Sequence, residues 1–338
     1  MTEVLTFAEA LGRSDPGKRK ILLGNGFSIA WRATAFTYRS LLEAADLSRL
    51  PRAKAVFDAL ETSDFEEVIR ALLSAARIAP AFGGTGVAMA DEMRRDAEAL
   101  KSILVEAIAS RHPDRPQAVG DEAFSACRTF LRNFECYYTL NYDLLLYWAL
   151  MHDEVDGTIL PRNDGFVNPD DEAGADYVVW EGGGEQDVHF LHGALHLLDA
   201  GAELQKRTWS RTAVPLMDQV RDALDQERYP LFVAEGESRQ KLNRIQHHGY
   251  LSRALRSFAS IGGDLFIYGH SLAPNDNHVL RKLERGKVKR LFISLYGDPA
   301  TPDNARIVRR GMEMSERRGS RKPLEVQFYD AASAGVWG

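Results

Sequence analysis

Short runs of apolar residues, separated by longer helical and polar segments, set the pattern of this chain. The first run covers residues 21–23, and six more follow at 136–140, 188–191, 231–234, 265–268, 291–295 and 326–329. Continuous apolar runs of this length are typical of parallel strands that are buried on both faces of a sheet. Helical stretches such as residues 244–259 lie between some of the runs. The pattern predicts an α/β fold with a doubly wound, mainly parallel sheet.

A long helical region separates the first predicted strand from the second. Residues 31–132 show helical periodicity and almost no strand signal. The clearest helix is expected over residues 64–78, where Ser63 and Glu66 make a capping box in front of apolar residues at helical spacing. Further helices are expected over residues 87–111 and 121–133. The region therefore predicts a helical insertion in the α/β domain.

Two other segments complete the predicted organisation. Residues 1–17 indicate a short helical lead-in, so the main domain is placed at residues 18–338. Residues 153–187 are rich in Gly, Pro and Asp, which predicts a long loop or hairpin over one edge of the sheet.

The composition narrows the class of protein. The 338 residues carry a formal net charge of −6, which gives no support for binding to nucleic acid or to an anionic membrane. No apolar run is long enough to span a membrane, and the first residues lack a secretory signal pattern. Cys127 and Cys136 are too few for a disulfide framework or a four-cysteine zinc site. We expect a cytoplasmic protein without a structural metal.

The first strand runs into a glycine turn, and Ser28 is expected to cap the helix that follows. A helix N-terminus presents free backbone N–H groups that favour a bound phosphate, and glycines allow a close approach. The last glycine of G-x-G-x-x-G is absent, so a turn in which glycine serves only as a hinge is the alternative. The candidate phosphate-binding residues are Gly24, Asn25, Gly26, Phe27 and Ser28.

Two further strand ends carry residues suited to catalysis. Asn141 and Asp143 follow the run at 136–140, where an Asx turn that caps the next helix is the alternative. His192 precedes a glycine after the run at 188–191. Because an imidazole titrates near neutral pH, His192 is a candidate general base, with a structural histidine as the alternative.

Two more strand ends carry residues suited to nucleotide binding. After residues 265–268, a glycine offers a backbone contact and polar side chains could bind ribose hydroxyls; these residues are Gly269, His270, Ser271 and Asp276. After residues 231–234, Glu235 could bind a ribose, and Arg239 and Lys241 could bind phosphate. A helix start with surface charges is the alternative for this second segment.

Together these segments resemble the sirtuin-like proteins of bacteria. The matching segments are GNGFS at 24–28, TLNYD at 139–143, LHG at 191–193 and GHSL at 269–272, in the order and spacing of that family. The segment VAEGESRQKL at 233–242 looks like a prokaryotic branch of the same clan that long had no assigned function. The resemblance covers most of residues 20–296 and implies a Rossmann-like domain that binds NAD in an extended pose.

The resemblance also implies roles for single residues. Residues 24–28 would surround the pyrophosphate, and Asn141 would position the nicotinamide ribose or an attacking water. His192 would act as a base or bind a ribose hydroxyl, while Asp143 is more often structural in that family. The adenosine side of the site would be formed by Gly269, Ser271 and Asp276.

One departure from the family bears on activity. Deacetylating sirtuins carry a four-cysteine zinc module that this chain cannot build, which favours the other activity of the clan, hydrolysis of NAD to nicotinamide and ADP-ribose. Many relatives act in antiphage defence, so a homo-oligomer or a defence-system partner protein is expected. A non-catalytic sensor of NAD or an ADP-ribose-type nucleotide, and an ADP-ribosyl transferase, are the alternatives.

Three histidines, His189, His192 and His196, lie near the end of this strand and raise the question of a metal site. His196 is expected one helical turn after His192, but the glutamate of H-E-x-x-H is absent, so no metal is expected. His189 is expected to pack against a covering helix, because alternate residues of a strand face opposite sides.

Overall fold

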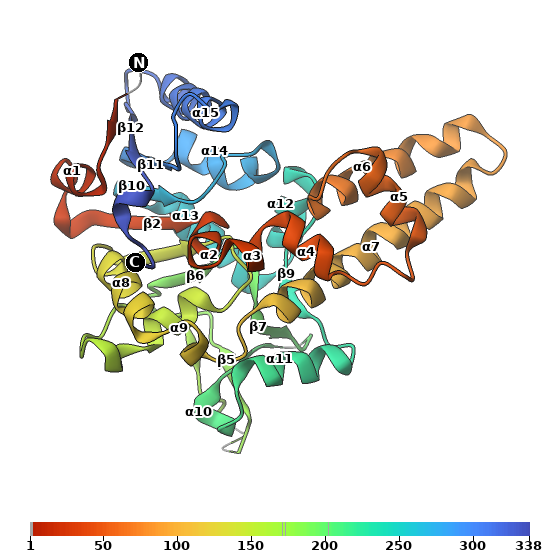
Figure 1. The fold of residues 1–338 in the computed structure, drawn as a ribbon, viewed down its shortest axis with the longest axis horizontal. Helices are drawn as coiled ribbons and strands as arrows, with labels where there is room; N and C mark the ends of the chain where they lie inside the picture. Colours follow the sequence, from red (N-terminus) through yellow and green to blue (C-terminus); the bar gives the residue numbers. More distant parts are fainter. Residues whose placement is uncertain (1–2, 171, 173, 202) are drawn as a thin grey trace.

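The central element of the computed structural model, which describes residues 3–170, 172, 174–201 and 203–338, is a seven-stranded parallel sheet (Figure 1). Its strands, in spatial order, are β1 (Val4–Leu5), β12 (Glu325–Asp330), β11 (Lys287–Leu295), β10 (Gly262–Tyr268), β2 (Arg19–Leu23), β3 (Cys136–Thr139) and β6 (Val188–Phe190). Every neighbouring pair in this sheet is parallel. The predicted α/β class with a Rossmann-like parallel sheet is therefore confirmed.

The sheet is buried on both faces. Consecutive residues of β10, Leu265, Phe266 and Ile267, have no exposed surface, although they point alternately to opposite faces. Helices therefore cover both sides of the sheet, as the continuous apolar runs predict.

The order of the strands reverses at β2. The chain continues from β2 through β3 to β6 on one side, and the strands β10, β11 and β12 build the sheet on the other side. At such a reversal the loops that leave the carboxyl ends of neighbouring strands diverge and open a crevice. The ends of β2, β3 and β10 are thus where a ligand site is expected.

A second, five-stranded antiparallel sheet lies beside the first. Its strands, in spatial order, are β4 (Phe166–Val167), β5 (Tyr177–Trp180), β8 (Leu204–Arg207), β7 (Gly193–Asp199) and β9 (Pro230–Phe232). The predicted hairpin within residues 153–187 is confirmed by the antiparallel pairing of β4 with β5.

Two sequence predictions are wrong in this region. The run at 231–234 was expected in the parallel sheet, but β9 pairs antiparallel with β7, since an apolar run does not encode the direction of its neighbour. The residues after His192 form strand β7, so His196 is not one helical turn away from it.

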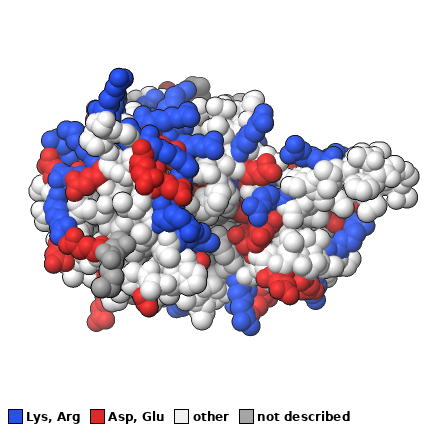
Figure 2. Space-filling model, turned by 90° about the horizontal axis from the view of Figure 1, so that it is seen from above, with Lys and Arg blue, Asp and Glu red and all other residues white. Residues whose placement is uncertain are grey.

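The helices between β2 and β3 confirm the helical insertion. They are α2 (Gly26–Trp31), α3 (Ala33–Phe36), α4 (Tyr38–Ala44), α5 (Pro51–Ala59), α6 (Phe65–Ile78), α7 (Gly86–Arg111) and α8 (Asp121–Leu131). Helices α6 and α7 form a hairpin that projects from the body of the molecule (Figure 1). Its far end carries no charged residue between positions 78 and 90 and shows white in Figure 2.

The other helices are α1 (Phe7–Gly12), α9 (Leu145–Met151), α10 (Trp209–Thr212), α11 (Leu216–Asp225), α12 (Ser238–Gln246), α13 (Gly249–Ser260), α14 (Asn277–Arg285) and α15 (Pro302–Arg318). The helix expected over residues 244–259 is two helices, because the chain breaks at His247 and His248 between α12 and α13. The segment expected to be a helical lead-in also contains strand β1, which pairs with β12. Among the residues described, no helix is both long and apolar enough to cross a membrane.

Candidate functional site

A cavity of about 1170 Å³ opens at the carboxyl ends of β2, β3 and β10. Eleven residues singled out in the sequence as site candidates line it: Gly24, Asn25, Gly26, Asn141, Asp143, His192, Lys241, Gly269, His270, Ser271 and Asp276. Segments more than 200 residues apart along the chain therefore meet around one space, as the reversal of strand order predicts.

Four other candidate residues do not line this cavity. Phe27 is buried with its ring 5.1 Å from that of Trp337, and Ser28 is buried behind the glycine turn. Glu235 accepts a hydrogen bond from Lys101 at 3.4 Å, and Arg239 is also absent from the lining. These four residues support the site from behind or lie outside it.

The glycines hold two loops against each other. A Cβ atom on Gly26 would lie 2.5 Å from Cα of Gly269, and one on Gly24 would lie 2.7 Å from the Gly269 carbonyl oxygen. The Gly26 N–H donates to that carbonyl at 2.8 Å, and the Gly24 N–H donates to the Tyr268 carbonyl at 2.9 Å. The absence of a side chain at these glycines therefore allows the two turns to pack closely against each other.

This packing leaves only some N–H groups for a phosphate. Those of Phe27 and Ser28 also donate within the turn, to Gly24 and Asn25. Among the described residues of the two turns, the backbone N–H groups of Asn25, His270 and Ser271 have no protein acceptor. These are the groups that a pyrophosphate in the cavity could meet.

Ser28, Asn141 and Asp143 form a buried hydrogen-bonded group at the cavity wall, in which Asn141 and Asp143 line the cavity and Ser28 lies behind them. The Ser28 hydroxyl donates to Asp143 Oδ2 at 2.5 Å, and Asn141 Nδ2 donates to Ser28 Oγ at 3.1 Å and to the Gly24 carbonyl at 3.0 Å. The expected cap role of Ser28 is wrong, because α2 begins two residues earlier, after Asn25. Both amide hydrogens of Asn141 are used within the protein, so its Oδ1 is left for a ligand.

Asp143 has the structural role that its Asx-turn alternative describes. Its Oδ1 accepts from the Leu145 N–H at 2.9 Å, at the start of α9. Burial raises the pKa of this carboxyl, while the Ser28 hydrogen bond lowers it. The carboxylate fixes the turn that carries Asn141.

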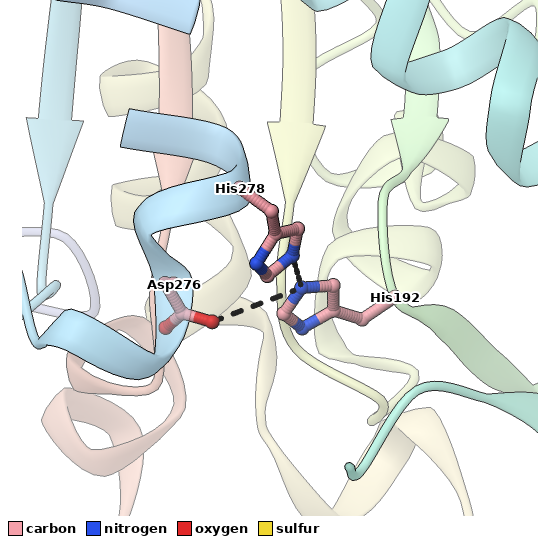
Figure 3. A group of neighbouring side chains, drawn as sticks. All are labelled: His192, Asp276 and His278. Atoms are coloured by element: carbon pink, nitrogen blue, oxygen red, sulfur yellow. Dashed lines mark hydrogen bonds and ion pairs between the residues drawn. The ribbon is translucent and has the colours of Figure 1, made fainter. Parts of the chain in front are cut away.

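His192 lies where β6 turns into β7. The turn needs Gly193, whose φ is +83° and whose Cβ would collide with the Leu231 carbonyl. His192 Nε2 lies 2.9 Å from His278 Nε2 and 3.8 Å from Asp276 Oδ1, and its other ring nitrogen points away from both residues (Figure 3). Burial, and then the Lys241 charge, hold the pKa of His192 well below its usual value, so the imidazole is neutral.

A buried charged cluster forms another part of the cavity wall, and its Asp276 bonds His270 of the turn after β10 at 3.0 Å. Lys241 Nζ lies 2.6 Å from Glu66 Oε2 and 3.1 Å from Asp276 Oδ1, and the lysine is 1% exposed. Burial raises the pKa of Glu66 to about 7, against the opposing effect of Lys241. Burial opposes the charge of Lys241, but the two carboxylates outweigh it and raise the pKa of the ammonium. The three side chains carry one net negative charge when Glu66 is ionised and none when it is protonated.

Local sequence patterns contain little that indicates this cluster. The predicted capping box includes Glu66, but Asp64 caps α6 and the Glu66 side chain reaches Lys241. For Lys241 the sequence predicts a phosphate ligand or a surface charge. Its spacing of four from the buried Ile245 on α12 is the signal that it lies on the covered face of that helix.

Three side chains could bring ligand atoms to one metal ion: His192, Asp276 and His278, whose nitrogen and oxygen atoms lie within 4.8 Å of one another (Figure 3). However, the Lys241 ammonium already bonds the Asp276 oxygen nearest His192. An ion there would face a buried positive charge, which opposes its binding. The expectation that no metal takes part stays a prediction.

The other two histidines have separate surroundings. His189 is buried, stacks on Tyr138 with ring centroids 4.7 Å apart and bonds Ser257 of α13 at 3.1 Å. The prediction that it packs against a covering helix is confirmed. His196 is fully buried and does not line the cavity.

A family model described as a domain of unknown function, DUF4917, matches residues 21–337. No curated protein matches the chain.

Proposed function

The chain belongs to the DUF4917 family, and we propose that it is an NAD hydrolase that cleaves the bond between nicotinamide and ribose to give nicotinamide and ADP-ribose. One observation carries the proposal: Asn141 and His192 line the same large cavity, and each has one polar side-chain atom without a hydrogen-bond partner among the described residues. The cavity volume of about 1170 Å³ exceeds the roughly 300–1,000 Å³ of ordinary small-molecule pockets, which suits an extended dinucleotide.

Hydrolysis of NAD requires few catalytic groups. When the glycosidic C–N bond breaks, its electron pair goes to the nicotinamide nitrogen, which leaves neutral, and positive charge develops on the ribose. No strong general acid is needed. A water then forms the new C–O bond and releases a proton. Asn141 Oδ1 is suited to orient that water, and the neutral His192 Nδ1 to accept the proton.

The charged cluster supports the same reaction. Glu66, Lys241 and Asp276 lie at the cavity wall and together carry a net negative charge when Glu66 is ionised. A negative potential there stabilises both the cationic nicotinamide ring of bound NAD and the positive charge that develops on the ribose. In this proposal the two glycine turns bind the pyrophosphate, and a homo-oligomer or a partner protein controls an activity used in antiphage defence.

The direct test is incubation of the purified protein with NAD and chromatography of the products. We expect nicotinamide and ADP-ribose, and a loss of turnover of roughly two or more orders of magnitude for His192→Ala. Asn141→Ala should also lose turnover, while His189→Leu, a buried histidine outside the cavity, serves as the matched control. A metal chelator should leave the rate unchanged.

Other outcomes decide between the alternatives. NAD that binds in calorimetry but stays intact would favour the nucleotide sensor. ADP-ribose found on an acceptor would favour the transferase. Loss of activity with a chelator, restored by zinc, would contradict the metal-free mechanism. For the biological role, bacteria that express wild type should lose NAD on phage infection, and those with Asn141→Ala should not.

A further inference from the structure

We propose that His278 is a positioning residue that fixes the tautomer of His192, so that the free lone pair of His192 is on Nδ1. This inference rests on the proposed function, in which His192 is the base. His278 lies in the second position of α14 and does not line the cavity.

The hydrogen bonds of the two rings determine where the protons lie. His278 Nε2 is occupied by His192 at 2.9 Å. Burial lowers the pKa of His278 to about 4, so its ring is neutral and has one N–H and one lone pair. The charge of Asp276, whose Oδ1 lies 3.8 Å from His192 Nε2, favours a proton on that nitrogen of His192, and Ser238 Oγ, 3.5 Å from His278 Nδ1, can accept the proton of His278.

A neutral imidazole has one donor and one acceptor. If His278 Nδ1 carries its proton, His278 Nε2 must accept, and His192 Nε2 must donate to it. The lone pair of His192 is then on Nδ1, the nitrogen that points away from His278 and Asp276 in Figure 3. Because His192 lines the cavity, this places the acceptor toward bound substrate.

Among the described residues, only His278 lies within hydrogen-bond distance of His192 Nε2. Asp276 Oδ1 is 3.8 Å from His192 Nε2, beyond hydrogen-bond distance, and already accepts from Lys241 at 3.1 Å. Without His278, the Nε2–H tautomer would leave a buried donor unpaired. The Nδ1–H tautomer would turn a donor toward the cavity and remove the base.

The arrangement also supports His192 after it accepts a proton. The imidazolium then carries hydrogens on both nitrogens, and the Nε2–H still donates to His278. Burial and the Lys241 charge lower the pKa of His192, and the charge of nearby Asp276 opposes that shift. His278 can therefore hold the ring in the same orientation before and after proton transfer.

The test compares His278→Leu with His278→Gln. Leucine removes the acceptor, whereas the glutamine amide oxygen can replace Nε2. We expect kcat of His278→Leu to fall about 100-fold, the scale of a mispositioned acid–base group, with little change in KM because His278 does not contact the cavity. His278→Gln should recover most of kcat, and His189→Leu should behave as wild type.

A second measurement does not depend on activity. Nitrogen-15 NMR of histidine-labelled protein, with His192 assigned through His192→Ala, distinguishes protonated from unprotonated ring nitrogens. We expect the Nε2–H tautomer in wild type and in His278→Gln, and an altered tautomer in His278→Leu. An Nδ1–H tautomer in wild type, or equal kcat for leucine and glutamine, would overturn the inference. If the protein does not hydrolyse NAD at all, the NMR experiment still measures the tautomer of His192. Failure of the proposed function is therefore distinguished from failure of the tautomer inference.

Discussion

The two walls of the cavity are built in different ways. One wall consists of the turns that follow β2, β3 and β10, and backbone contacts between glycines hold it together. The other wall consists of side chains from α6, α12 and the turn before α14, and buried charges hold it together. The first wall is encoded in short local motifs. The second exists only once distant helices have packed.

The largest effect is expected from a substitution that disrupts the wall formed by the glycine turns. Gly26→Ala places a Cβ 2.5 Å from Cα of Gly269, so one backbone must move away from the other. We expect NAD binding to be lost in calorimetry, together with a lower melting temperature, because the turns also form the end of the core. The matched control is Gly17→Ala, whose Cβ meets no atom within 4 Å. Normal NAD affinity in Gly26→Ala would show that this wall does not form the binding site.

The next largest effect is expected from a substitution that disrupts the wall formed by Glu66, Lys241 and Asp276. Lys241→Met leaves two buried carboxylates without their cation, a change that costs roughly 3–5 kcal/mol of unfolding free energy in comparable buried pairs. Urea unfolding measures the loss. Removing a carboxylate as well, in Lys241→Met with Glu66→Gln, should restore part of the stability. A double variant less stable than the single one would contradict the assignment of a mutually compensating cluster.

The smallest effect concerns histidines that belong to neither wall. Burial lowers the pKa of His112 and of His189 to about 4, against about 6.5 in an unfolded chain. Between these values the unfolded state binds more protons, so the unfolding free energy should fall as the pH drops from 6.5 to 4 and should stay level above 6.5 with respect to these groups. Urea titrations at several pH values measure this slope, and His189→Leu should reduce it. A protein that gains stability on acidification through this window would contradict the prediction.

The comparison of the two walls also explains what could be predicted from the sequence. The apolar runs located β2, β3, β6, β10, β11 and β12, because strands buried on both faces carry a continuous local signal. Residues such as Gly24 and Asn141 stood directly after those runs, so the fold itself brought them to one edge. These parts needed no knowledge of tertiary packing.

The remaining parts depended on packing that no local pattern records. Glu66 sits in the first turn of a helix, where acidic residues are common for local reasons, and only the packing of α6 brings it to Lys241. His278 has no motif around it, and its role comes from one contact with a residue 86 positions away. The direction of β9 was missed because a three-residue apolar strand looks the same in either sheet.

The indole of Trp337 has a practical consequence for binding measurements. It lines the cavity, stands 5.1 Å from the Phe27 ring and donates through Nε1 to the Phe27 carbonyl at 2.8 Å. None of the other four tryptophans lines that space. Since indole emission follows the polarity of its surroundings, a nucleotide that displaces water there should shift the fluorescence of this side chain alone. A variant in which Trp337 is the sole tryptophan would report occupancy of the cavity optically, with no added dye.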